Sequence, residues 1–325
     1  MTCHYPFPEK WVDGEAICLA VAGARFTGKS VFIAVMVKEL AEMVVEMGYC
    51  LSTVETLLTS GREHYKTKYE EQLLKARNML TPTLTAAVGD PFDRHPLILN
   101  LGIPARNRKG SVYLVIRDVA GEDLEATGDA PHLRFYQNAS MVLFMFDPTQ
   151  INEVQAELKG LVGAMNTEGA PAKEVIDKVL RLSSGGNVML GVAFSKFDTL
   201  QEIGARNIAT PRGQKLAPAG AAFNREPEML GTNAPRTMYD DVDGGLLSAE
   251  VRSMLMDLGA KELVNQLERP SSGAPIDHRF FALSALGAPS ENNQVNPRGI
   301  APFRVLDPIK WVLFRHGVVQ GMKGE

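Results

Sequence analysis

Short apolar runs recur along the chain and alternate with stretches of helical spacing. Runs of this kind are typical of strands that are buried on both faces, as in a parallel sheet. The stretches between them suit the helices that carry a chain from one parallel strand to the next. The pattern therefore predicts an α/β fold with a mainly parallel sheet and helices on both faces. The expected strands are 16–22, 112–116, 141–146, 187–194 and 279–283.

One pair of expected strands breaks this alternation. The apolar segment 97–101 is separated from 112–116 by a basic turn at 105–110 and by no helical stretch. Two strands that are joined by a turn of this kind pair in an antiparallel way. We therefore expect one antiparallel edge strand in an otherwise parallel sheet.

Periodicity and end signals locate the expected helices. The helix after residue 30 runs to about Met47, where Gly48 can take the left-handed C-terminal position. Asp307 is expected to cap a last helix that begins with Pro308. Further helices are expected at about 131–138, 151–165, 172–182 and 248–268.

The segment 62–80 has the pattern of an exposed amphipathic helix. Tyr65, Tyr69 and Leu73 recur every four residues, with charged residues between them. This spacing indicates a helix face that packs on the core, and a partner-binding face is the alternative. Pro82 ends the helix, because the residue before a proline avoids the helical region.

Composition indicates a globular protein of 325 residues, with 45% hydrophobic and 22% charged residues and a net charge of −4. This supplies a sizeable core and no basic footprint for nucleic acid. No apolar run approaches the roughly 18 residues that a membrane span requires, and no signal-peptide pattern is present. We expect a cytoplasmic protein with a single domain over residues 1–325. Within it, 51–96 is an elongated segment and 200–247 an irregular insertion.

The segment Gly23–Ser30 reads G-x-x-x-x-G-K-S and lies between an apolar run and a helix-like run. Strand, glycine-rich loop and helix form the context that a phosphate-binding loop requires. The glycines let backbone N–H groups turn toward phosphate oxygens, and the helix N-terminus adds partial positive charge. Lys29 is expected to reach the β- and γ-phosphates, and the Ser30 hydroxyl is a suitable ligand for Mg²⁺. The segment predicts nucleotide binding, with a flexible surface loop as the alternative.

A second motif, Asp118-Val119-Ala120-Gly121, follows the strand at 112–116. In phosphate-loop proteins an aspartate at the end of a second strand holds Mg²⁺, usually through water. The N–H of Gly121 would then contact the γ-phosphate, and loss of that phosphate would release the segment. The motif therefore predicts both a metal ligand and a switch.

A third motif, Ser195-Lys196-Phe197-Asp198, follows the strand at 187–194. The carboxylate of Asp198 can accept two hydrogen bonds from guanine, whereas adenine would leave it unpaired at a high cost. The stem of Lys196 can lie across the base. The segment Ser284-Ala285-Leu286 would add a backbone N–H to the guanine oxygen.

These four segments, in this order, resemble those of the Ras-like and translation-factor class of regulatory GTPases, and more loosely the bacterial double-GTPase-like domains. The resemblance implies a three-layer G domain that binds GTP or GDP with Mg²⁺ and hydrolyses GTP slowly. The chain departs from the family pattern at Ser195, where Asn or Thr is usual, and at Leu286, where Lys is usual. The predicted nucleotide-binding residues are Gly23, Ala24, Arg25, Phe26, Thr27, Gly28, Lys29, Ser30, Val31, Ser195, Lys196, Asp198, Ser284, Ala285 and Leu286.

The resemblance also implies residues that set the rate of hydrolysis. Thr83 is the expected switch-one residue, which contacts Mg²⁺ and folds over the γ-phosphate, and Thr81 and Thr85 are the alternatives. Glu122 stands where Ras-like proteins have a water-positioning glutamine. Its carboxylate could orient water, but its charge would repel the γ-phosphate, and a side chain that points to solvent is the alternative. The expected catalytic residues are Lys29, Thr83, Gly121 and Glu122, and the expected metal ligands are Ser30, Thr83 and Asp118.

Two other functions fit the same phosphate loop. One is an ATPase or small-molecule kinase, which requires a substrate pocket and tolerance for adenine. The other is an interaction module that holds nucleotide without hydrolysing it. For the leading function the expected partners are a guanine nucleotide and a protein effector or regulator, which would bind at 62–80 or at the insertion.

Overall fold

The computed structural model describes most of the chain. The described residues are 7–8, 10–55, 61–80, 95–125, 131–147, 172–184, 186–207, 209, 211–216, 221–225, 235–270, 276–290 and 294–322. The expected helix at 151–165 lies outside the described residues. None of the described helices is long and apolar enough to cross a membrane.

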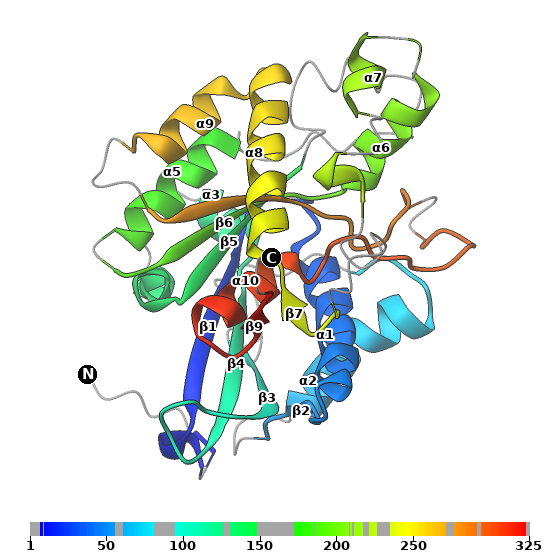
Figure 1. Cartoon of the computed structure of the whole chain (residues 1–325). Coiled ribbons are helices and arrows are strands. Elements are labelled where there is room, and N and C mark those ends of the chain that lie inside the picture. Colours follow the sequence, from blue (N-terminus) through cyan, green and yellow to red (C-terminus); the bar gives the residue numbers. More distant parts are fainter. Residues whose placement is uncertain are drawn as a thin grey trace.

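A seven-stranded sheet forms the centre of the molecule, in the order β2-β3-β4-β1-β5-β6-β8 (Figure 1). Neighbouring strands are parallel from β4 across to β8, which confirms the predicted α/β fold. Strands β5 and β6 are buried along their whole length, as their apolar sequences require. The main strands are β1 (Glu15–Ala22), β3 (Leu97–Pro104), β4 (Ser111–Asp118), β5 (Met141–Phe146), β6 (Met189–Phe194) and β8 (His278–Ala282).

The antiparallel hairpin is formed by β3 and β4, as predicted from the turn between them. A short strand that the sequence did not reveal, β2 (Ser52–Thr53), pairs with the outer side of β3. Two residues are too few to show a hydrophobic period, so nothing in the sequence marks this strand.

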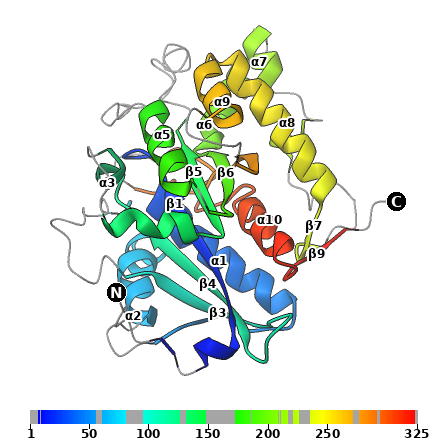
Figure 2. The same cartoon turned by 90° about the vertical axis from the view of Figure 1, so that its left-hand side faces the viewer.

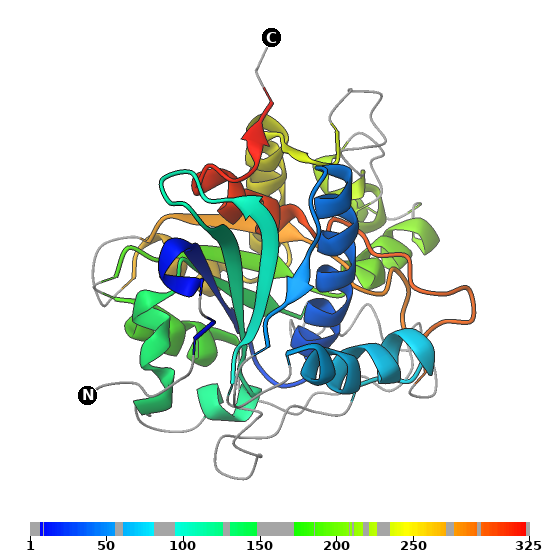
Figure 3. The same cartoon turned by 90° about the horizontal axis from the view of Figure 1, so that it is seen from below.

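Helices cover both faces of the sheet and make three layers (Figures 2 and 3). One face carries α1 (Lys29–Glu46) and α10 (Asp307–Arg315). The other carries α3 (Gly121–Glu125), the 3₁₀-helix η4 (Pro131–Asn138), α5 (Ala172–Ser183) and α9 (Lys261–Glu268). The predicted helices at 131–138 and 172–182 are thus confirmed. Helix α1 ends at Glu46 with Met47 as its C-cap, close to the predicted end, and Gly48 follows at φ 84°.

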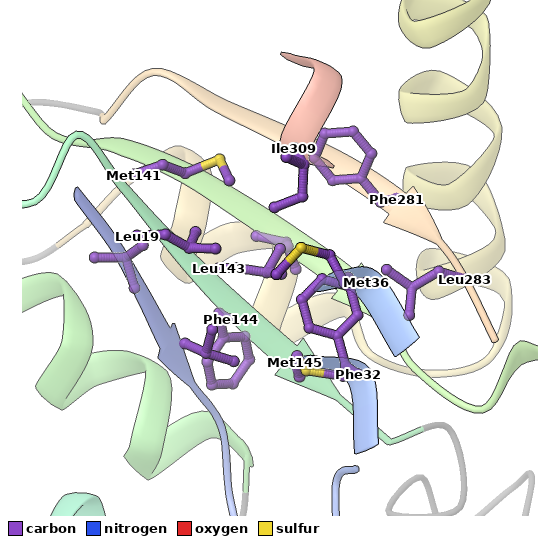
Figure 4. Packing of buried hydrophobic residues seen from close by; sticks show 14 of the residues in the cluster. Leu19, Phe32, Met36, Met141, Leu143, Phe144, Met145, Phe281, Leu283 and Ile309 are labelled. Atoms are coloured by element: carbon purple, nitrogen blue, oxygen red, sulfur yellow. The ribbon is translucent and has the colours of Figure 1, made fainter. Parts of the chain in front are cut away.

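The core lies between these helices and the sheet. Phe32 and Met36 of α1 and Ile309 of α10 lie over the strand residues Leu143 and Phe281 (Figure 4). All five side chains are fully buried. Because burial of such a side chain contributes about 1.5–3 kcal/mol, this layer fixes α1, and with it the loop that precedes α1, against the sheet.

The region 200–247 contains more helix than its sequence suggests. It includes most of α6 (Phe197–Arg206), α7 (Pro211–Leu216), the 3₁₀-helix η6 (Ala222–Asn224), strand β7 (Met238–Tyr239) and the start of α8 (Asp241–Asp257). Strand β7 pairs with β9 (Gln320–Gly321) near the C-terminal end.

The helix expected at 248–268 is wrong in its bounds. The structure has two helices here, because α8 begins at Asp241 and ends before Gly259, whose φ of 92° breaks the helix ahead of α9. The carboxylate of Asp240 accepts hydrogen bonds from the N–H groups of Val242 and Asp243, each at 3.0 Å. This N-cap, which the sequence analysis missed, moves the helix start seven residues upstream of Ser248.

The amphipathic segment 62–80 is helical and packs on the core. It forms α2 (Gly61–Tyr65) and a π-helix, η2 (Lys66–Lys75), which contacts α1. Tyr69 is 2% exposed and Leu73 is fully buried, so the predicted core-facing stripe is confirmed. The helix ends before Arg77, whose φ is 57°.

Asp307 does not cap the last helix, contrary to the sequence-based expectation. The N-cap is Leu306, and Asp307 is the first residue of α10. Its carboxylate accepts a hydrogen bond of 2.5 Å from Nε of the buried Arg304. The Asp307 carboxylate therefore pairs with the buried guanidinium and does not accept a hydrogen bond from the free N–H groups at the start of α10.

Candidate functional site

The phosphate-loop motif forms a tight turn between β1 and α1. Gly23 and Gly28 have φ angles of 146° and 86°, and Phe26 has a φ of 60°. A Cβ atom on Gly23 would lie 2.5 Å from the carbonyl oxygen of Met145, so the loop also packs closely against β5. Gly23 is therefore required by both conformation and space, and Gly28 by its conformation.

The loop opens directly onto the N-terminus of α1. Gly28 is the N-cap residue, and its carbonyl accepts the first helical hydrogen bond from Phe32 at 2.8 Å. The helix has 18 residues, so its first free N–H groups form the positive end of a long dipole. This end of α1 favours an anion such as phosphate.

The side chain of Lys29 is held inside the loop. It is 7% exposed, and Nζ donates hydrogen bonds of 2.8 Å to the carbonyl oxygens of Gly23 and Ala24. The Thr27 hydroxyl also donates to Ala24, at 3.0 Å. Lys29 thus places a cation in the position from which it can bind phosphate oxygens at the mouth of the loop.

Ser30 and Asp118, the two predicted metal ligands in the described part of the chain, are in contact. Strands β1 and β4 run parallel with Val21 opposite Asp118. The phosphate loop and the Asp118–Gly121 motif, which follow these strands, therefore lie at the same edge of the sheet. The Ser30 hydroxyl donates a hydrogen bond of 2.8 Å to Oδ2 of Asp118. A hydroxyl and a carboxylate are hard oxygen ligands, and this donor set fits Mg²⁺.

Gly121 brings the second motif against the phosphate loop. A Cβ atom on Gly121 would lie 2.6 Å from the backbone nitrogen of Arg25 and 2.9 Å from the carbonyl carbon of Ala24. Only a glycine permits this approach between two backbones. The side chain of Glu122 and all of Thr83, Thr81 and Thr85 lie outside the described residues.

Asp198 and Ser284 form a buried pair at the other end of the sheet edge. Asp198 is 8% exposed and Ser284 is 1% exposed. The Ser284 hydroxyl donates to Oδ1 of Asp198 at 2.5 Å and accepts from the N–H of Gly287 at 2.8 Å. Burial raises the pKa of the Asp198 carboxyl, and the hydrogen bond from Ser284 partly opposes this shift.

Lys196 and Ser195 hold the turn between β6 and α6. Lys196 has a φ of 53°, and its Nζ lies 2.5 Å from Oδ2 of Asp147, which is 2% exposed. The hydroxyl of Ser195 donates to the carbonyl oxygen of Phe146 at 3.1 Å. The sequence analysis missed Asp147, although its place at the end of the β5 run was a signal for it.

The other predicted nucleotide-binding residues lie on the phosphate loop, on α1 and in the loop that follows β8. Val31 is 8% exposed on α1, whereas the ring of Phe26 is 39% exposed at the outside of the loop. Ala285 and Leu286 pack partly buried against the core, and the Leu286 carbonyl accepts a hydrogen bond of 3.0 Å from Ala301. The loop that follows β8 is thus tied back to the protein.

All of these groups meet at one edge of the sheet. The phosphate loop, Asp118, Asp147, Ser195 and Ser284 follow the carboxyl ends of β1, β4, β5, β6 and β8, which are mutually parallel. The strand order reverses at β1, the position at which open α/β sheets bind their ligands. This edge therefore presents the positive N-terminus of α1 and the buried carboxylate of Asp198, which can accept hydrogen bonds.

A buried ion cluster that the sequence did not reveal fastens the loop before α10. Arg304 donates to Oδ2 of Asp243 at 2.6 Å and to Asp307, and also to the carbonyl oxygens of Ala222 and Arg225. Its neighbour Phe303 forms two backbone hydrogen bonds with Ser284, of 3.0 and 2.8 Å. The cluster therefore connects η6 and α8 to the Ser284 loop.

Comparisons with known proteins identify a clear relative. No family model matches the chain. The chain is 39% identical over 321 residues to "Putative ESX-1 scaffolding and assembly protein SaeC" of Mycolicibacterium smegmatis, and the match covers 98% of this chain and 79% of that protein.

A solved structure with a weak likeness is the S. cerevisiae Ski7 GTPase-like domain, bound to GTP. It aligns with 96% of this chain at 11% identity and a TM-score of 0.36, and the match spans about half of that structure, 51%. The strand order and the strand directions themselves define the α/β fold.

Proposed function

We propose that this chain, which belongs to the same family as SaeC, is a guanine-nucleotide-binding switch that hydrolyses GTP slowly. One observation carries the proposal. The phosphate loop with its Ser30–Asp118 pair and the buried Asp198–Ser284 pair lie at the same carboxyl edge of one sheet. An anion site and a base-selective carboxylate on one edge are what a nucleoside triphosphate requires.

In the phosphate half of the site, backbone N–H groups of the loop and of the first turn of α1 bind phosphate oxygens. Nζ of Lys29 exchanges its two carbonyl partners for the β- and γ-phosphates. Ser30 and Asp118 would hold Mg²⁺, which would neutralise charge on the phosphates. These groups position the triphosphate and stabilise charge, and they supply no covalent chemistry.

In the base half, Asp198 accepts hydrogen bonds from N1–H and the amino group of guanine. Its burial makes an unpaired carboxylate costly, so a base without these donors is rejected. The stem of Lys196 lies beside the base while its ammonium stays with Asp147. Ala285 and Leu286 contribute backbone to the same side of the site.

The switch rests on the close contact between Gly121 and the phosphate loop. A γ-phosphate bound at the loop would change the contact between Gly121 and Arg25. The segment from Asp118 to Gly121 would therefore respond to the hydrolysis of GTP. Thr83 is proposed to close over the γ-phosphate from the segment 51–96. Glu122 is a weak replacement for a water-positioning glutamine, since its charge repels phosphate, and hydrolysis is therefore slow.

The name of the SaeC relative, a scaffolding and assembly protein, favours a protein partner for the switch. We propose that segments 62–80 and 200–247 bind this partner in a nucleotide-dependent way. The same name supports a second candidate function, in which the chain holds nucleotide without hydrolysing it and serves only as an interaction module.

Phosphate release from GTP tests the proposal against the second candidate. The wild type is expected to release phosphate slowly, and Lys29→Ala should remove both release and tight GTP binding. Lys38→Ala on the same helix is the matched control, because Lys38 is exposed and forms ion pairs with the neighbouring Glu39 and Glu42. Tight GTP binding without phosphate release would favour the second candidate, and absence of GTP binding would contradict both.

A further inference from the structure

Tyr69 contacts the candidate magnesium ligand, and no sequence motif places it there. Its hydroxyl donates a hydrogen bond of 3.3 Å to Oδ2 of Asp118. The same oxygen accepts the hydrogen bond of 2.8 Å from Ser30. Tyr69 is 2% exposed, so its ring is fixed by packing and its hydroxyl is directed at the carboxylate.

The segment that carries Tyr69 is anchored on both sides of the site. The Tyr65 hydroxyl donates to the carbonyl oxygen of Ala34 on α1 at 2.9 Å. Beyond the other end of η2, the Arg77 carbonyl accepts a hydrogen bond of 2.9 Å from Val295, in the loop that follows Ser284. Figure 1 shows η2 in cyan beside this loop, in orange. Tyr69 is therefore held in place from the phosphate side and from the base side.

The local backbone is also unusual. The ten residues of η2 form a π-helix, a conformation that is rare, occurs mostly as single-turn bulges inside α-helices and is frequent at functional sites. A π-helix is less favourable than an α-helix, so this segment persists because its buried contacts, Tyr69 and Leu73 among them, select it. The same buried face that holds this conformation carries the Tyr69 hydroxyl to Asp118.

We propose that Tyr69 is a positioning residue for Mg²⁺, and this inference rests on the proposed function. With donors from two elements on Oδ2, the Asp118 carboxylate is fixed in one orientation relative to Ser30. Partners of this kind, which orient a metal-holding carboxylate from outside, strengthen metal binding. The Tyr69 hydroxyl thereby lowers the Mg²⁺ concentration at which the nucleotide complex is stable.

The test is the rate of GTP dissociation as a function of free Mg²⁺ for wild type and Tyr69→Phe. The variant keeps the buried ring and loses only the hydroxyl. Its half-maximal Mg²⁺ concentration should rise about tenfold, while dissociation in excess EDTA should stay as in the wild type. Tyr49→Phe is the matched control, because it removes the hydroxyl of an exposed tyrosine that lies after the C-terminal end of α1, outside the segment that carries Tyr69. Its Mg²⁺ requirement should not change.

A double-mutant cycle provides a second readout without any ligand. The melting temperatures of Tyr69→Phe, Asp118→Asn and the double variant in EDTA should be non-additive, since both single changes remove the same contact. An unchanged Mg²⁺ requirement in Tyr69→Phe, or additive losses of melting temperature, would overturn the inference. If the wild type binds GTP normally, either result removes only the role of Tyr69. Absence of GTP binding in the wild type would instead overturn the proposed function, and this inference with it.

Discussion

Ser284 donates a hydrogen bond of 2.5 Å to the carboxylate of Asp198 across the ends of the neighbouring strands β8 and β6. The N–H of Gly287 in turn donates to the Ser284 oxygen at 2.8 Å, which directs the hydroxyl proton toward Asp198. The carboxylate is thereby held in one orientation in a site that water reaches poorly. Selectivity for guanine depends on this pair in the proposed function.

Replacement of Asp198 by asparagine should change which base is preferred. An amide accepts one hydrogen bond and donates another, which suits the N1–H and C2 carbonyl of xanthine rather than guanine. We expect Asp198→Asn to lose roughly 100-fold in GTP affinity, about 2.7 kcal/mol, and to gain affinity for xanthosine triphosphate. Calorimetry with both nucleotides measures the change. Asp177→Asn on α5 is the matched control, and an unaltered preference for GTP in Asp198→Asn would refute the base assignment.

The affinity for GTP should depend on pH through Asp198. Burial raises the pKa of this carboxyl, and the protonated form cannot accept both guanine N–H groups. Affinity should therefore be full above the raised pKa and fall as the pH is lowered through it. The fall should begin at higher pH in Ser284→Ala, because the hydrogen bond from Ser284 lowers this pKa. Titration of Asp198→Asn should show no such dependence, and a parallel pH profile in that variant would contradict the account.

The raised pKa of Asp198 should also make the free energy of unfolding depend on pH, in the direction opposite to that of the GTP affinity. The folded protein holds the Asp198 proton more tightly than the unfolded chain does, so this group favours the folded state at low pH. Its contribution should be complete below the ordinary pKa of an aspartate and be lost as the pH rises through the raised value. The difference in unfolding free energy between wild type and Asp198→Asn, measured by urea titration across this range, should fall as the pH rises. A difference that rises with pH would show that the pKa is lowered instead.

Gly121→Ala should disturb both stability and the sensing of the γ-phosphate. The added Cβ would meet backbone atoms of Arg25 and Ala24, which cannot rotate away. We expect a loss of about 1–3 kcal/mol in unfolding free energy and a smaller ratio of GTP to GDP affinity. Gly245→Ala is the control, because nothing lies within 4 Å of a Cβ at that helical position. Wild-type stability together with a wild-type affinity ratio in Gly121→Ala would argue against a switch at this contact.

The sheet and the phosphate loop could be predicted because their signals are local. The apolar runs of β5 and β6 and the G-x-x-x-x-G-K-S pattern are complete within a few residues. The placement of Asp118 beside Ser30 then follows from parallel pairing of the strands that lead to them. Contacts of this kind can be predicted from the fold class and from a motif at the end of each strand.

Other features depend on contacts between distant residues. Tyr69 is 49 positions from Asp118, and Arg304 is 61 positions from Asp243, so no local pattern reports either contact. The amphipathic stripe correctly placed Tyr69 on the core side but not at the metal ligand. Asp307 has the local signature of a cap, and the buried guanidinium of Arg304 overrides that signature.

The proposed function requires that the site binds a guanine nucleotide with Mg²⁺. Calorimetry on purified protein stripped of nucleotide, with GTP, GDP and ATP in the presence of Mg²⁺, measures this binding. GTP should bind at least about 100-fold more tightly than ATP, a difference of about 2.7 kcal/mol. Equal affinity for ATP and GTP would contradict the role of Asp198 and would favour an ATPase or a small-molecule kinase on the same phosphate loop.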